Sequence, residues 1–474
     1  MKKIVFWGAG KIGQYMLEAW RQLGISPNFF ADNQEGLNIC QGIKVLSMEE
    51  VRALGSVKIV VTCKQYEVVL EQLIENGISK SDIFKGNTLD DMLIFWAFHM
   101  KERLQWKGEA EESSNLKEKF SHRVLLDLQS GFVLGGVESW ALQMEEVLTA
   151  HGAEVKYIVP KGVGKIGKKV GHKLIELDFK AEDSEFDRWK QYVEGIRKNI
   201  PCNVVCNFTY ITFKAACFAK MFWPDQVNLI AVVHNDEEDY YKWYGMMEEW
   251  IDFCMVMSHK IEQELIKRGM DREKFVYLAR LIPCEDILAK EYTKDGNPIS
   301  LGYAGRLVIK QKRLDLLMEA ARQLEDKNID FRLEIAGTGE YEKELKAQVE
   351  IFGDKVCLKG YISDEQFADF WKDKDIMVSC SEWEGHSASQ QEAMAAGTVP
   401  VITDVSGARD DVEDGYNGYV VPVGDIDSLV DRICYLYCHR ELLKLMGERS
   451  HQRILKKNAE YDEDAMWDRI LKKV

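Results

Sequence analysis

The stretch SCSEWEGHSASQQEAMAAG, residues 379–397, gives the strongest indication of a binding site in the sequence. A buried strand is predicted to end at Cys380, a short polar loop carries Glu384, and a helix is predicted to begin near residues 387–389. The loop amides and the positive end of the helix suit a diphosphate. Glu392 follows Glu384 by eight positions, so two carboxylates could hold hydroxyl groups on either side of that phosphate.

The same segment also has a purely structural interpretation. Ser389 and Glu392 have the spacing of a capping box, in which both side chains only bind amides at the start of a helix. Spacing alone does not decide between a ligand-binding carboxylate and a capping residue.

The chain on both sides of this segment alternates between strand and helix patterns. One region opens with the strand RVLLDL (123–128) and a helix at 136–152, and the next opens with ISLGYAG (299–305). Further strands are predicted at 153–159, 202–208, 229–234, 333–337, 356–360, 375–380, 399–403 and 418–422, before a helical tail. Such alternation predicts mostly parallel sheets whose ligand site lies at the carboxyl ends of the strands.

A smaller unit of the same kind begins the chain. Its first strand leads into a turn with Gly8, Gly10 and Gly13, and the next strand ends at Asp32. This is the dinucleotide-binding fingerprint, in which the glycines admit a pyrophosphate and the acid binds a ribose. The unit is short and lacks a substrate domain of its own. NAD binding, nucleotide-sugar binding and a scaffold or oligomer contact therefore all remain open.

Composition indicates an ordinary globular protein of 474 residues, 46 % hydrophobic and 30 % charged. Its net charge of −16 disfavours sequence-independent binding to nucleic acid, which requires a basic surface. Eleven cysteines without any CxxC spacing fit free thiols in a reducing compartment. The first apolar run is too short for a signal peptide, and no window approaches the roughly 20 apolar residues of a membrane span. We therefore expect a cytoplasmic protein.

Two Asp-x-Asp pairs are interpreted as structural. Asp373 and Asp375 precede a strand, at the end opposite to the expected ligand site. Asp425 and Asp427 open the helical tail, where capping explains them. The sequence therefore predicts no metal site.

Segment 379–397 resembles the E-x7-E signature of retaining glycosyltransferases, in particular of glycosyltransferase family 4. The matching residues are Glu384, Gly385, Glu392, Ala393, Met394, Ala395 and Gly397. His386 stands where the family commonly has an aromatic residue, and Ser387 begins a stretch where glycine and proline are common. The resemblance implies that Glu384 contacts donor-sugar hydroxyls in the catalytic site and that Glu392 binds the ribose. It also places Gly385, His386 and Ser387 in the donor site.

Other segments resemble the family in the expected order. The segment 303–320 implies that Arg306 and Lys312 bind the nucleotide diphosphate, whose growing negative charge needs cations. A solvated helix start is the alternative for these two residues. The segments 335–346 and 355–363 resemble the nucleotide-side loops, which implies that the backbone of Gly360 and Tyr361 meets the base.

The region from residue 134 to 155 resembles the opening Gly-Gly loop and helix of the family. The resemblance implies that Gly135 and Gly136 approach the donor phosphate or the acceptor. His234 ends a strand and matches a family histidine near the anomeric carbon, which implies a catalytic role. A lone histidine at a strand end is otherwise more often structural.

The resemblance, over residues 122–455, implies an α/β protein with a GT-B fold of two facing Rossmann-like domains, preceded by a small Rossmann-like domain. We expect that small domain at 1–88, a linker at 89–121, an acceptor-side domain at 122–297 and a donor-side domain with C-terminal helices at 298–474. The implied reaction is retaining and metal-independent, with no cofactor. It moves a sugar from a UDP-sugar, favoured over a GDP-sugar, to a saccharide or lipid-linked acceptor of bacterial surface polysaccharide.

Two other functions stay open. The same scaffold serves sugar-nucleotide epimerases, and the N-terminal module could make the protein an NAD-dependent oxidoreductase. The basic helix 439–457 is either a solvated face or a peripheral contact with the inner face of a membrane. An oligomer formed through the N-terminal module is also compatible with the sequence.

Overall fold

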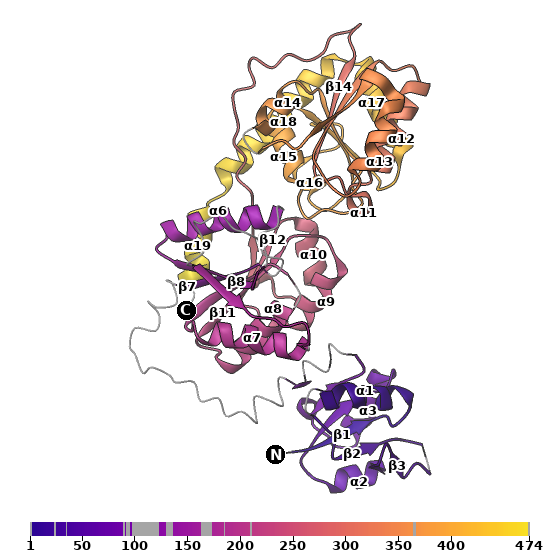
Figure 1. Cartoon of the computed structure of the whole chain (residues 1–474), viewed down its shortest axis with the longest axis vertical. Coiled ribbons are helices and arrows are strands. Elements are labelled where there is room, and N and C mark those ends of the chain that lie inside the picture. Colours follow the sequence, from indigo (N-terminus) through magenta and orange to yellow (C-terminus); the bar gives the residue numbers. More distant parts are fainter. Residues whose placement is uncertain are drawn as a thin grey trace. The chain divides into compact units, whose positions relative to one another are not determined.

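A computed structural model describes most of the chain as two compact units, the first built on the N-terminal strands and the second on two larger sheets. The described residues are 2–22, 25–34, 36–88, 91, 95–96, 123–128, 136–162, 173–183, 185–208, 211–363 and 366–472. Gly135 lies outside them, and so does the expected linker 89–121 apart from residues 91, 95 and 96. Figure 1 shows the described elements in sequence colours.

The N-terminal unit contains a small sheet with the strand order β3-β4-β2-β1-β5-β6, in which only β3 and β4 pair antiparallel. Its elements are β1 (Lys3–Trp7), α1 (Lys11–Gln22), β2 (Phe29–Ala31), β3 (Ile39–Cys40), β4 (Ile43–Leu46), α2 (Met48–Ala53), β5 (Val57–Val61), α3 (Tyr66–Glu75) and β6 (Ile83–Lys85). Every residue of β5 is buried, as expected for a central parallel strand covered on both faces.

The middle domain is built on a parallel sheet of described strands in the order β13-β12-β11-β10-β7-β8-β9. Its elements are β7 (Arg123–Asp127), α6 (Gly136–Ala150), β8 (Glu154–Pro160), β9 (Leu174–Leu177), α7 (Glu185–Arg197), β10 (Cys202–Cys206), α8 (Ile211–Phe222), β11 (Val227–Val233), α9 (Glu238–Met246), β12 (Phe253–Val256), α10 (His259–Lys267) and β13 (Phe275–Tyr277). Strand β11 is apolar and rich in β-branched residues apart from Asn228. It is buried along its whole length and ends one residue before His234.

The C-terminal domain contains a second parallel sheet, in the order β16-β15-β14-β17-β18-β19. Its elements are β14 (Ile299–Ala304), α11 (Ile309–Lys312), α12 (Leu314–Asp326), β15 (Phe331–Ala336), α13 (Glu342–Val349), β16 (Val356–Gly360), α14 (Phe367–Lys372), β17 (Ile376–Ser379), α15 (Ala388–Ala395), β18 (Val399–Thr403), α16 (Ala408–Asp411), β19 (Tyr419–Val421), α17 (Ile426–Cys438) and α18 (Glu441–Glu460). The strand order reverses between β14 and β17, and the loops that follow these two strands carry Arg306 and Glu384. Such a reversal is where open α/β sheets bind ligands.

The final described helix, α19 (Glu463–Lys472), follows the C-terminal domain in sequence but packs elsewhere. Its buried side chains Met466, Trp467, Ile470 and Leu471 belong to the hydrophobic core of the middle domain. The chain therefore crosses between the two larger domains twice, once before β14 and once before α19.

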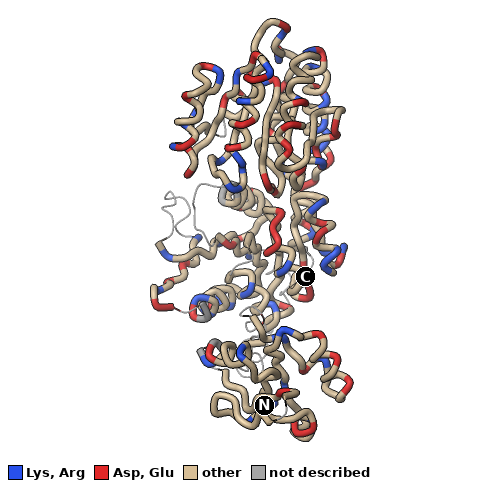
Figure 2. Tube along the Cα trace, turned by 90° about the vertical axis from the view of Figure 1, so that its right-hand side faces the viewer, with Lys and Arg blue, Asp and Glu red and all other residues tan. Residues whose placement is uncertain are grey.

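Three basic residues of α18 bind other groups of the same domain. Arg449 donates to the Tyr416 carbonyl, Arg453 to the Asp410 carbonyl, and Lys457 binds buried Asp411. Figure 2 shows basic and acidic residues interspersed along the described chain. Among the described helices, none combines the length and the apolar character that a membrane span requires.

Candidate active site

Lys312 and Glu384 form an ion pair between the ends of two neighbouring strands. Lys312 ends α11, which follows β14, and Glu384 lies in the loop after β17. Lys312 Nζ lies 2.5 Å from Glu384 Oε1, and the side chains are only 15 % and 9 % exposed. The burial rules out the solvated helix start as the setting of Lys312. An ammonium group held here can serve a second anion, because it has three N–H donors.

The helix α15 begins directly after this loop, as the sequence predicts. Ser387 is its N-cap, and the Ser387 hydroxyl accepts a hydrogen bond from the Gln390 amide. Ser389 instead donates from Oγ to the Ala304 carbonyl at 2.5 Å, so it ties α15 to the end of β14. The capping box between Ser389 and Glu392 is therefore wrong, since the helix starts two residues earlier.

Glu392 lies on α15 beside a cation that sequence reasoning missed. Arg280 Nη2 lies 3.4 Å from Glu392 Oε1, and the Glu392 side chain is 14 % exposed. Arg280 comes from the segment that joins the middle and C-terminal domains. A cationic residue in such a joining segment has no local pattern that would mark it as a site residue.

Three other predicted donor-site residues lie at the carboxyl edge of the same sheet. Arg306 is exposed and donates from Nη2 to Gln311 at 3.0 Å. Gly360 ends β16, and its carbonyl accepts a hydrogen bond from the Gly337 amide at 2.7 Å. Tyr361 follows with 63 % of its surface exposed. The structure thus places the phosphate-side and base-side candidates on one edge of one sheet.

His234 is buried at the end of β11, and its hydrogen bonds define its tautomer. Its Nε2 lies 2.9 Å from Asn207 Oδ1, while Asn207 Nδ2 donates to the Asp127 carbonyl at 2.8 Å. The amide nitrogen of Asn207 faces a carbonyl, so its oxygen must face the histidine and accept from Nε2–H. Burial lowers the pKa of His234 to about 3, which keeps the ring neutral with a lone pair on Nδ1.

The Glu384 loop contacts the His234 segment directly. The Asp236 amide donates to the Glu384 carbonyl at 3.3 Å. A Cβ atom built at Gly385 would lie 1.7 Å from the His234 carbonyl oxygen, so only glycine allows the two backbones this close. The two residues predicted to be catalytic, His234 and Glu384, are thereby brought together from different domains.

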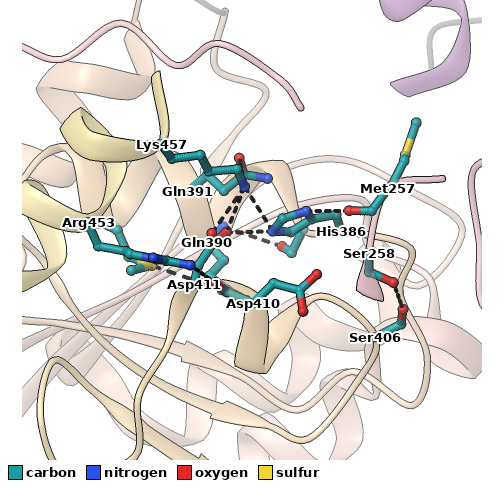
Figure 3. Close-up of polar contacts among 12 residues, drawn as sticks. Met257, Ser258, His386, Gln390, Gln391, Ser406, Asp410, Asp411, Arg453 and Lys457 are labelled. Atoms are coloured by element: carbon teal, nitrogen blue, oxygen red, sulfur yellow. Dashed lines mark hydrogen bonds and ion pairs between the residues drawn. The ribbon is translucent and has the colours of Figure 1, made fainter. Parts of the chain in front are cut away.

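His386 is held entirely by protein groups (Figure 3). Its Nδ1 lies 2.8 Å from the Met257 carbonyl oxygen, and its Nε2 lies 2.5 Å from Asp411 Oδ2. Lys457 Nζ also binds the Asp411 carboxylate, at 3.1 Å from Oδ1 and 3.2 Å from Oδ2. Burial raises the pKa of Asp411, but the His386 ring and the Lys457 ammonium outweigh it and hold that pKa at about 2. Sequence reasoning named His386 but missed Asp411 and Lys457.

The four residues of the N-terminal fingerprint, Gly8, Gly10, Gly13 and Asp32, lie together in the N-terminal unit. Asp32 Oδ2 accepts a hydrogen bond from the Ala9 amide at 2.7 Å, and Oδ1 accepts from the Gln34 amide at 3.0 Å. Gly13 packs against the Gly8 carbonyl, where a Cβ would lie 1.8 Å from the oxygen. A mostly apolar hollow of about 350 Å³ is lined by Lys11, Ile12, Tyr15, Met16, Asn87 and Thr88. Gly10 has open space around it, so the turn itself stays accessible.

One aspartate of each Asp-x-Asp pair has structural partners. Asp375 accepts hydrogen bonds from the Thr293 amide and hydroxyl and from the Ser300 amide. Asp425 caps α17 through the Ser428 amide. Within the described residues, no group of three or more His, Cys, Asp or Glu side chains could hold a metal ion. All eleven cysteines are free.

Comparison with known families identifies the domain that carries most of this site. Residues 285–453 match the family model described as Glycosyl transferases group 1. This segment includes Arg306, Lys312, Glu384 and Glu392. This segment is therefore similar to group 1 glycosyltransferase domains.

Curated relatives are glycosyltransferases as well. The putative glycosyltransferase EpsD of Bacillus subtilis (strain 168) is 32 % identical over 142 residues, which are 30 % of this chain and 37 % of EpsD. The chain thus spans little more than a third of that relative. The putative colanic acid biosynthesis glycosyltransferase WcaL of Escherichia coli (strain K12) is 24 % identical over 335 residues, which are 63 % of this chain and 82 % of WcaL.

Solved structures support the architecture. The crystal structure of Anabaena HepE in complex with UDP and glucose matches with a TM-score of 0.53 and 16 % identity, covering 73 % of this chain and 97 % of HepE. At this identity the likeness concerns the fold. The expected GT-B fold is confirmed by glycosyltransferase neighbours of this kind together with the two parallel sheets of the second unit.

Proposed function

We propose that this protein is a retaining glycosyltransferase that moves a sugar from a nucleotide diphosphate sugar to a saccharide or lipid-linked acceptor. The observation that carries the proposal is the largely buried pair of Lys312 and Glu384, in a GT-B fold. The next residue of the same loop, Gly385, lies against the His234 backbone. The relationship to WcaL supports a role in bacterial surface polysaccharide synthesis.

The donor would bind mostly to the C-terminal domain. Arg306 and Lys312 supply positive charge for the diphosphate, and the positive end of α15 adds to it. Glu392 would accept hydrogen bonds from the ribose, in exchange for its contact with Arg280. The backbone at Gly360 and Tyr361 would meet the base. A UDP-sugar is the favoured donor, which the UDP complex of HepE supports.

In the proposed step, the bond between the anomeric carbon and the diphosphate breaks while the acceptor oxygen bonds to that carbon on the same face. The acceptor proton passes to an oxygen of the leaving diphosphate. Glu384 is paired with Lys312, and a paired carboxylate is a weak nucleophile, so we assign it the orientation of sugar hydroxyls. The neutral ring of His234 can accept a hydrogen bond from a sugar hydroxyl at Nδ1.

A thermal-shift panel tests the donor site. UDP, GDP, ADP, CMP and NAD are each added at millimolar concentration to the wild type, to Glu392→Ala and to the control Glu344→Ala, whose glutamate is exposed on α13. A ligand at ~100 times its dissociation constant adds about 2.7 kcal/mol to the free energy of unfolding. We expect a shift with UDP that Glu344→Ala retains and Glu392→Ala loses.

The other outcomes distinguish the remaining functions. A shift with NAD alone, equal in all three proteins, would move the function to the N-terminal unit and contradict the proposal. Conversion of a UDP-sugar to its epimer without any acceptor would identify an epimerase instead. Transfer of labelled sugar to a saccharide acceptor, with the anomeric configuration retained in the product, is the expected result.

A further inference from the structure

The turn between β12 and α10 binds the C-terminal domain through consecutive residues. Ser258 Oγ lies 2.6 Å from Ser406 Oγ, and the His259 amide donates to Asp410 Oδ2 at 2.9 Å. The preceding carbonyl, that of Met257, accepts a hydrogen bond from the C-terminal domain as well. We call residues 257–259 the docking turn. Because every residue of the turn is engaged, its position is tied to that of the C-terminal domain.

The third contact of the docking turn comes from His386. The Met257 carbonyl and the Asp411 carboxylate both accept hydrogen bonds, at 2.8 Å from Nδ1 and 2.5 Å from Nε2. The His386 side chain is 4 % exposed and that of Asp411 is 1 % exposed, so water contributes little to this arrangement.

The charges around this ring are balanced by groups from several elements. Asp411, at the end of α16, also binds Lys457 of α18, and Lys457 donates to Gln391 of α15 at 3.2 Å. Lys457 Nζ lies 3.4 Å from the His386 ring. Figure 3 shows His386 and Lys457 in contact with each other and with Asp411, and Met257 at the opposite side of the His386 ring. A buried cluster of this kind holds its members in one geometry, since an unpaired buried charge is costly.

His386 lies two residues after Glu384, so a fixed ring also fixes the loop. The same loop meets the His234 segment through the Asp236 amide and the close approach of Gly385. We infer that His386 is a positioning residue that fastens this loop to the docking turn and thereby sets Glu384 beside His234. This inference rests on the proposed function. His386 would act through Glu384, without touching the donor.

Steady-state kinetics of His386→Gln tests this role, with His439→Gln as the matched control at a partly exposed histidine of the same domain. Since Arg306, Lys312 and Glu392 are unchanged, the KM for the UDP-sugar should stay within about twofold. A loop displaced by about 1 Å costs up to about 10²-fold, so kcat should fall at least about tenfold. Asp411→Asn should lower kcat too, and the double variant should be no slower than His386→Gln, because both changes break one cluster.

Hydrogen exchange of the docking turn gives a second readout that needs no activity. The His259 amide should exchange faster in His386→Gln than in the wild type or His439→Gln. Equal exchange in the three proteins would overturn the positioning role, and so would a wild-type kcat in His386→Gln. A wild type that neither binds UDP nor transfers sugar would overturn the proposed function, and with it the catalytic part of this inference. Faster exchange would then establish the docking contact alone.

Discussion

The glycine turn of the N-terminal unit and the Glu384 loop of the C-terminal domain each have a carboxylate next to a close contact between backbones. The two carboxylates differ in the groups that bind them. Asp32 accepts hydrogen bonds from two backbone amides, whereas Glu384 is bound by the side chain of Lys312. Backbone amides in a turn cannot be reoriented without unfolding it. A lysine has a flexible stem and can share its ammonium group with a phosphate. The first carboxylate therefore supports the turn, and the second is suited to a ligand.

The close backbone contacts of Gly13 and Gly385 also differ in what they join. Gly13 approaches the Gly8 carbonyl five positions earlier, while Gly385 approaches the His234 carbonyl in another domain. The first contact shapes one turn, and the second assembles a site from two domains. The expected effects of substitutions follow from this difference.

Removing the ammonium group of Lys312 should have the largest effect on sugar transfer. In Lys312→Ala the leaving diphosphate loses a charge-assisted donor, so kcat for sugar transfer should fall by about 10²–10³-fold. Lys310→Ala, which removes an exposed lysine of the same short helix, should transfer at the wild-type rate. Initial rates with a labelled UDP-sugar measure both variants. Equal rates for both would remove the main support for the Lys312 and Glu384 pair as the donor site.

The substitution of Gly385 should have the second largest effect on sugar transfer, and the substitution of Gly13 is its matched control. Gly385→Ala forces the loop away from His234, and transfer should fall by about 10²-fold. Gly13→Ala places a methyl group against the Gly8 carbonyl, so it should destabilise the N-terminal unit and leave transfer unchanged. Rates and denaturant unfolding are measured on both. If Gly13→Ala slows transfer as strongly as Gly385→Ala, the two regions do not act separately.

The substitution Asp32→Ala tests whether this carboxylate contributes only to the stability of the N-terminal unit. The Ala9 and Gln34 amides lose their acceptors, which should lower the free energy of unfolding of the N-terminal unit by about 1–3 kcal/mol. Sugar transfer should not change. Asn33→Ala, an exposed neighbour, serves as the control for unfolding in denaturant. A loss of transfer in Asp32→Ala would show that this carboxylate does more than support its turn.

The smallest expected effect is a pH dependence from buried His234. Its pKa is lowered to about 3, against about 6.5 when unfolded, so between these values the unfolded chain binds a proton that the folded chain does not. Stability then falls as the pH falls. Between pH 7.5 and 5.5 this amounts to about 1 kcal/mol. His234→Gln should flatten the curve by that amount in denaturant unfolding at both pH values, and an unchanged curve would contradict a neutral buried ring.

Much of the fold could be predicted because the apolar strands are short and bounded by turns. The strands predicted at 356–360 and 399–403 coincide with β16 and β18, and α15 begins where the loop pattern ends. The short strand β9 could not be predicted in this way, because LIEL is neither a continuous apolar run nor bounded by glycine or proline.

The candidate site was predictable where its residues lie in one segment or follow neighbouring strands. Glu384 and Lys312 follow β17 and β14, which pair in the sheet, so the topology brings them together. Lys457 and Asp411 lie 71 and 25 positions from His386, and their meeting depends on tertiary packing that no local pattern encodes. The one available signal was a polar histidine at a position where the family commonly has an aromatic residue.

The return of α19 to the middle domain has a consequence for synthesis on the ribosome. The strands of that domain are complete at residue 277, yet Trp467 and Ile470 belong to its core. At about 5–20 residues per second, roughly 10–40 s of elongation separate the last strand from the helix that covers it. During that interval the nascent middle domain exposes apolar surface. All strands of the C-terminal domain are synthesised before α19. The C-terminal domain can therefore finish folding before the middle domain, which precedes it in the sequence.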